Sequence, residues 1–166
     1  MYNDTYVELL IQKKTPVWLL ALRIVTTAAA AVLALLGLLG LLPFLIGAIV
    51  CGAVAYFVYL ESNMEYEYLY VDRQLSIDKV MAKSRRKKAV EFDLERMEVL
   101  APIHSYHLDA YKNKNYKTLD YSSGVASEPD TRYVMYFNGE QKVILEPDVQ
   151  MLKAIQNIAP RKVFTD

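Results

Sequence analysis

An uninterrupted apolar stretch near the N-terminus dominates the hydropathy pattern, and it contains no Asp, Glu, Lys, Arg or His between Arg23 and Glu61. A bilayer core of ~30 Å takes about 20 apolar residues per helix, so residues 16–60 suffice for two spans. A single helix of that length would measure ~65 Å, which is far more than one bilayer. Glycines and a proline are closely spaced in residues 37–43 and favour a turn there. The pattern therefore predicts a transmembrane hairpin with helices at about residues 16–37 and 43–60.

Charged and aromatic residues predict the orientation of this hairpin. Thr15 can cap the first helix. Pro16 suits the first turn, because the backbone N–H that proline lacks would have no helical partner at that position. Basic residues flank this end, whereas the central turn is uncharged, so the positive-inside rule places both termini in the cytoplasm. Arg23 lies close enough to the start of the first helix for its long side chain to reach the interface. The interfacial aromatic residues expected at that end are Trp18, Tyr56 and Tyr59.

Residues 1–15 precede the hairpin and show helical spacing of their larger side chains. Asp4 or Thr5 can cap a helix here, so we expect a short amphipathic helix over residues 4–14. The sequence leaves open whether it lies on the membrane surface or packs on the following domain. The residues that carry the spacing are Tyr6, Leu9, Leu10 and Lys13.

Residues 61–166 change to the periodicity of strands. Alternating apolar and polar positions, separated by turn residues, predict about seven strands. Asn138-Gly139 suits the left-handed backbone of a two-residue turn and predicts a hairpin, whereas Ser105 begins a predicted short helix through Tyr111. The expected strands are residues 66–71, 75–81, 89–92, 96–101, 116–121, 132–137 and 141–146.

A C-terminal amphipathic helix completes this part, because Pro147 precedes an apolar stripe at helical spacing. Strands followed by one such helix are the order of a pleckstrin-homology-like domain, and a plain meander is the alternative. The expected fold is an α+β membrane protein: a two-helix transmembrane hairpin, then an antiparallel β domain with a C-terminal helix. Its expected parts are residues 1–15, 16–60 and 61–166. The predicted stripe is Met151, Leu152, Ile155, Ile158 and Ala159.

The overall composition conceals this division. The 166 residues are 54% hydrophobic and 23% charged, with a formal net charge of zero, as in an ordinary soluble domain. Because the charges are segregated, a single soluble domain is excluded. Cys51 is the only cysteine, which excludes a disulfide scaffold. The neutral overall charge argues against nucleic acid as a partner.

The densest charge in the chain is a basic run between the second and third predicted strands. Each basic residue near an anionic leaflet contributes roughly 1 kcal/mol of attraction, so the run is a candidate site for anionic lipid or another anion. The alternative is a solvated turn balanced by nearby carboxylates. The candidate residues are Lys83, Arg85, Arg86, Lys87 and Lys88.

Tyrosines on the first predicted strand form a second candidate surface. Tyr66, Tyr68 and Tyr70 share one face of that strand and are the expected contact for a protein partner, since tyrosine is enriched at interfaces. Half-buried sheet positions are the alternative, because tyrosine also favours strands.

Catalytic motifs are not found in the sequence. There is no Gly-rich phosphate loop, no Gly-x-Ser-x-Gly and no His-Glu-x-x-His. His104 and His107 have a spacing that can serve a metal on a helix, but nothing nearby completes a site. We therefore expect no enzyme activity, no cofactor and no metal.

Four sequence motifs and the C-terminal segment carry a resemblance to a known family. The chain is similar to an uncharacterised, domain-of-unknown-function family of small Gram-positive bacterial membrane proteins, over nearly its whole length. It also resembles bacterial pleckstrin-homology-like domains carried on transmembrane hairpins. The resemblance implies a bacterial plasma-membrane location and supplies no catalytic residue. The segments are Tyr66–Asp72, Leu75–Lys79, Ala82–Lys88, Met97–Pro102 and Ala159–Phe164.

Together these features predict a membrane-anchored binding or scaffolding module. Its expected partners are membrane lipid, and a second copy of the chain or another membrane protein. The alternative is an accessory subunit of a membrane transport complex, in which the helix pair packs on a larger partner.

Overall fold

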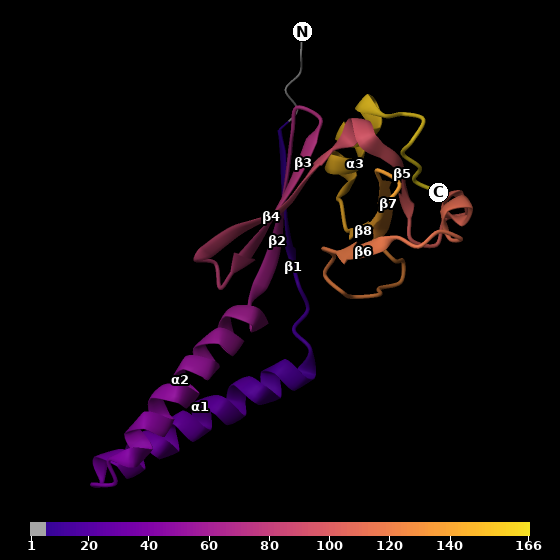
Figure 1. The fold of residues 1–166 in the computed structure, drawn as a ribbon. Coiled ribbons are helices and arrows are strands. Elements are labelled where there is room, and N and C mark those ends of the chain that lie inside the picture. The colour runs from indigo at the N-terminus through magenta and orange to yellow at the C-terminus, as the bar shows by residue number, and fades with distance from the viewer. Residues whose placement is uncertain (1–5) are drawn as a thin grey trace. The chain divides into compact units, whose positions relative to one another are not determined.

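A computed structural model describes residues 6–166, which form two compact units (Figure 1). The helical unit comprises residues 15–64 and 81–85. The β unit comprises the described residues up to Lys14, residues 65–80 and residues 86–166. Each unit has its own packing and is described by itself.

The helical unit is an antiparallel hairpin of α1 (Val17–Leu38) and α2 (Pro43–Ser62). Gly40 has φ +101°, a conformation that glycine adopts without steric cost, and it lies in the turn between the helices. A side chain at Gly37 would clash with the side chain of Leu45, so glycine permits the close approach of the two helices. At the open end, the Thr15 hydroxyl donates a hydrogen bond to the Ser62 carbonyl. The predicted hairpin is confirmed.

Both helices expose long apolar side chains. Leu19 and Gly37 are the buried residues of α1, and Val58, Leu60 and Ser62 are those of α2. A core helix of a soluble protein would be mostly buried, because exposing this much apolar surface to water is unfavourable. Length, composition and exposure make α1 and α2 candidate membrane-spanning helices.

The first sheet of the β unit has the order β1-β2-β3-β4. Its strands are β1 (Val7–Gln12), β2 (Met64–Val71), β3 (Gln74–Met81) and β4 (Arg85–Asp93).

The prediction of a helix over residues 4–14 is wrong, because residues 7–12 form strand β1. This strand pairs antiparallel with β2 through six consecutive positions, from Val7 opposite Tyr70 to Gln12 opposite Glu65. An isolated helix this short is unstable in water, whereas the edge of β2 offers a row of unpaired N–H and C=O groups. Pairing with that edge outweighs the local helical pattern. The predicted capping residues, Asp4 and Thr5, lie outside the described residues.

The second sheet has the order β5-β7-β8-β6. The short 3₁₀ helix η1 (Leu94–Arg96) leads from β4 into β5. A two-residue turn at Asn138-Gly139, both with positive φ, joins β7 to β8 and confirms the predicted hairpin. Residues 61–166 thus form seven strands, as the sequence predicts, and β1 is the eighth strand of the β unit within residues 6–166. The strands of this sheet are β5 (Met97–Pro102), β6 (Lys117–Asp120), β7 (Tyr133–Phe137) and β8 (Gln141–Leu145).

The main core of the β unit collects the inner faces of both sheets and one face of α3 (Val149–Ile158). Met151, Leu152 and Ile155 of the predicted stripe are buried, whereas Ile158 is 37% exposed at the end of the helix. Fully buried side chains from the strands include Tyr68, Ile77, Phe92, Leu100, Met135 and Leu145.

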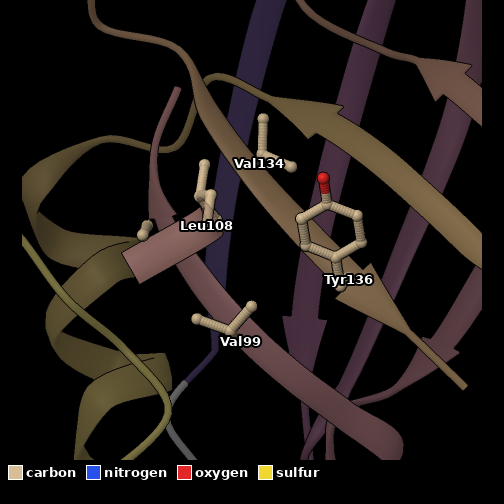
Figure 2. Packing of buried hydrophobic residues seen from close by; sticks show 5 residues of the cluster. Val99, Leu108, Val134 and Tyr136 are labelled. Carbon is tan, nitrogen blue, oxygen red and sulfur yellow. The ribbon is translucent and has the colours of Figure 1, made fainter. Parts of the chain in front are cut away.

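A smaller core covers the opposite face of the second sheet (Figure 2). Val99 of β5 and Val134 and Tyr136 of β7 lie on this face beneath Leu108 of the 3₁₀ helix η2 (Tyr106–Tyr111). Ser105 caps η2 by accepting a hydrogen bond from the His107 N–H. The short helix predicted from Ser105 is therefore present, in 3₁₀ form, and it closes the outer face of the sheet.

We expect Asp148→Ala to lower the free energy of unfolding by about 1 kcal/mol. The Asp148 carboxylate accepts a hydrogen bond of 2.7 Å from the Met151 N–H and so caps α3. Urea unfolding of the full chain in detergent, followed by near-ultraviolet circular dichroism, measures the loss. Asp148→Asn keeps an acceptor and should retain most of the stability; equal losses in both variants would contradict the capping role.

Candidate functional site

The basic run lies at the tip of the β3–β4 hairpin. Ala82 and Lys83 have φ values of +48° and +56°, and the Ser84 N–H donates to the Met81 carbonyl, which closes a two-residue turn. Positive φ at both central positions matches the twist of a hairpin but is disfavoured for residues other than glycine, asparagine and aspartate. Surrounding contacts must therefore hold the tip in this conformation.

The tip is bound to the C-terminal end of α2. The Ala82 N–H donates a 2.7 Å hydrogen bond to the carbonyl of Asn63, the residue that follows α2. The guanidinium of Arg85 lies 5.9 Å from the ring centroid of Tyr56, within the range of a cation–π contact. Residues 81–85 accordingly belong to the helical unit. The tip of the basic hairpin is held at one end of the candidate membrane spans.

Arg23 adds a further positive charge to the helical unit. Its guanidinium lies 4.8 Å from the ring centroid of Tyr59 on α2. Tyr59 is one turn before the end of α2, and the Thr15–Ser62 hydrogen bond marks the same end. The Arg23 side chain therefore extends toward the open end of the hairpin. This direction is consistent with the prediction that its long side chain reaches the membrane interface.

The five predicted basic residues differ in how their charge is balanced. All five are exposed. Arg86 donates a 2.8 Å hydrogen bond to the Glu67 carboxylate, and Lys88 pairs with Glu91. Within residues 6–166, Lys83 and Lys87 have no ion-pair partner, so their charges are available to an external anion.

Glu67 is a buried carboxylate, with a side chain only 2% exposed. Burial raises its pKa, Arg86 lowers it, and the nearby Glu8 carboxylate raises it again. One of its oxygens, Oε2, has no hydrogen-bond partner among residues 6–166. Arg86 is therefore committed to a structural charge pair and is the least available of the five to a ligand.

The predicted partner surface of Tyr66, Tyr68 and Tyr70 is wrong. These side chains are 2%, 0% and 2% exposed, because their shared face is the inner face of the first sheet. Tyr66 packs edge-on against Tyr121 with ring centroids 5.5 Å apart. The Tyr68 hydroxyl donates to the Tyr121 carbonyl at 2.6 Å and accepts from the Glu146 N–H at 3.3 Å. The alternation of aromatic residues marks the core of the domain.

The two histidines have different carboxylate partners. The Nε2 atom of His104 lies 3.4 Å from an Asp130 oxygen, and that of His107 lies 3.6 Å from an Asp166 oxygen. His107 is also stacked on Phe164, with centroids 3.6 Å apart. Among residues 6–166, no cluster of three or more His, Cys, Asp or Glu has the geometry of a metal site.

Two β-sheets with a C-terminal helix, and two candidate membrane-spanning helices between β1 and β2, define a pleckstrin-homology-like class of protein. The chain belongs to the bacterial PH-like domain family (DUF6106), whose family model matches residues 3–165. No curated protein and no solved structure shows significant similarity to the chain. PH-like domains are generally non-catalytic. The predicted resemblance and fold class are confirmed.

Proposed function

We propose that the chain is a membrane-anchored binding module whose basic hairpin tip contacts anionic lipid at the inner leaflet. The observation that carries this proposal is the attachment of the tip to the end of α2, through Ala82 to Asn63 and Arg85 to Tyr56. If α2 spans the bilayer, its end lies at the interface, and the tip is held there with it. Binding, rather than catalysis, is the proposed role of the β unit.

Charge distribution supports an orientation with both termini in the cytoplasm. Arg23 and the basic tip belong to the open end of the hairpin, whereas the turn between α1 and α2 is uncharged. Basic residues are retained on the cytoplasmic side of bacterial membranes, whose inner leaflet attracts them. In this orientation the chain crosses the membrane twice.

Lys83 and Lys87 are the residues best placed to test the lipid contact, since both are exposed and unpaired within the described part of the chain. We expect the full chain in detergent, given both lipids in equal amounts, to retain more phosphatidylglycerol than phosphatidylcholine in native mass spectrometry. The double variant Lys83→Gln/Lys87→Gln should lose roughly 2 kcal/mol of this preference if both lysines contact headgroups.

A matched control removes the same charge elsewhere. Lys117 on β6 and Lys153 on α3 are exposed, so Lys117→Gln/Lys153→Gln should keep the wild-type preference. Equal retention of the two lipids by the wild-type chain would refute the proposal. So would an equal loss in both double variants, because the effect would then be one of net charge only.

A further inference from the structure

A second cationic site lies on the outer face of the second sheet, in the β unit. A hollow of about 240 Å³ is lined by tyrosines and lysines that come from separate segments of the chain. Tyr111 ends η2, Lys112 and Lys114 lie in the turn that follows, and Tyr116 precedes β6. We call this feature the lysine–tyrosine hollow; its principal residues are Tyr111, Lys112, Lys114, Tyr116, Tyr136 and Lys142.

Strand pairing and ring stacking build the floor of the hollow. Tyr136 on β7 and Lys142 on β8 are directly opposite each other in the antiparallel register, so their side chains share one face of the sheet. The ring of Tyr111 stacks on that of Tyr136 at 4.7 Å, and the ring of Tyr116 lies 4.6 Å from it. Tyr136 is 3% exposed. The tyrosine rings therefore hold one another in place, and the site is rigid on this side.

One buried hydroxyl of the hollow has hydrogen-bonding capacity that no described residue uses. The Tyr116 hydroxyl is buried and has no hydrogen-bond partner among residues 6–166. Buried polar groups in native proteins nearly always have a partner, and exceptions call for an explanation such as a ligand. Burial also raises the pKa of Tyr111 and Tyr136, so these hydroxyls stay protonated near neutral pH and are able to donate.

The charge around the hollow selects an anion. Lys112 forms an ion pair with Asp109 at 2.6 Å. The negative charge of the nearby Glu98 carboxylate raises the pKa of Tyr111. Lys114 and Lys142 have no ion-pair partner within the described residues, which leaves the hollow with a net positive charge. No arginine lines it. Its cations are therefore lysines, and lysine, as a point charge, is a common ligand of phosphate.

We propose that the lysine–tyrosine hollow binds a phosphate monoester. Lys114 and Lys142 would neutralise the phosphate, and the Tyr116 hydroxyl would donate a hydrogen bond to one of its oxygens. A volume of about 240 Å³ accommodates a phosphate together with a small organic group attached to it. The source is either a soluble metabolite or the headgroup of a lipid. This site is separate from the hairpin tip, and either can exist without the other.

Titration calorimetry on the full chain in detergent micelles tests the proposal with glycerol 3-phosphate, and in a second arm with short-chain phosphatidic acid. We expect at least one of them to bind, and Tyr116→Phe and Lys142→Gln each to weaken binding by about tenfold. Binding of glycerol 3-phosphate identifies a soluble source, and binding of phosphatidic acid alone identifies a lipid headgroup. Tyr116→Phe keeps the ring, so its packing against the ring of Tyr136 persists.

Two control variants separate this site from net charge and from the hairpin tip. Lys153→Gln removes an exposed lysine of α3 and should leave the affinity unchanged. Lys83→Gln/Lys87→Gln should also leave it unchanged, even where that variant abolishes the preference for phosphatidylglycerol. The proposal is overturned if neither probe binds, or if Tyr116→Phe and Lys142→Gln bind as tightly as Lys153→Gln.

Discussion

Tyr68→Phe is expected to lower the free energy of unfolding by about 1–3 kcal/mol, although it removes a single oxygen atom. The Tyr68 ring is completely buried, and its hydroxyl bridges the Tyr121 carbonyl and the Glu146 N–H, which join the first sheet to segments beside the second. Phenylalanine would leave both backbone groups without this partner. Tyr68→Ala adds a cavity, so we expect a total loss of about 3–5 kcal/mol.

Urea unfolding of the full chain in detergent, followed by near-ultraviolet circular dichroism, measures these losses. Tyr106 is 66% exposed, so Tyr106→Phe removes the same atom at a solvated position and should change stability by less than about 0.5 kcal/mol. Similar values for the two phenylalanine variants would show that the buried hydrogen bonds of Tyr68 contribute nothing measurable.

Arg86→Met is expected to destabilise the chain at neutral pH and much less in acid. The substitution keeps an aliphatic side chain over the sheet but removes the counter-charge of the buried Glu67 carboxylate. Removing one member of a fully buried pair costs about 3–5 kcal/mol; because Arg86 is 61% exposed and water screens it, we expect about 1–2 kcal/mol.

The pH dependence follows from the raised pKa of Glu67. Burial raises that pKa in the native state, and loss of Arg86 would raise it further. Between the pKa of Glu67 in the unfolded chain and its higher pKa in the native state, the native state holds a proton that the unfolded chain has already released. Stability therefore falls as pH rises through this interval. The loss in free energy of unfolding caused by Arg86→Met should accordingly be largest above the native-state pKa of Glu67. It should disappear below the ordinary carboxyl pKa of 4.5.

Unfolding of Arg86→Met at several pH values, compared with wild type, tests this expectation. Lys87→Met is the matched control, since Lys87 is exposed on the same strand and has no ion-pair partner in the described chain. Glu67→Gln/Arg86→Met should recover most of the stability, because no charge remains buried. A loss that is independent of pH, or that the double variant does not recover, would show that Arg86 acts through packing.

Strand β1 shows where sequence reasoning meets its limit. Residues 7–12 carry a spacing compatible with both a helix and a strand, and they become a strand because β2, more than 50 residues later, presents a free edge. Pairing between such distant segments has no local signature. The C-terminal hairpin is the opposite case, because Asn138-Gly139 encodes its own turn.

The candidate sites show the same division. The basic run is visible in the sequence, but its attachment to α2 rests on a hydrogen bond between residues 63 and 82 and on a turn formed without glycine. The lysine–tyrosine hollow is assembled from η2, the following turn, β7 and β8. No spacing along the chain predicts that Tyr116 and Lys142 meet. A sequence signal existed only in the tyrosine-rich character of residues 106–116.

The sequence by itself determined the two apolar helices, the strand-rich remainder and the C-terminal helix, because hydrophobic periodicity and turn chemistry are local properties. Tertiary structure alone decided which face of each strand is buried. Tyr66, Tyr68 and Tyr70 became core rather than surface because the second sheet and α3 cover that face. It also decided which lysines remain unpaired, since a charge is neutralised by whatever carboxylate the fold brings beside it.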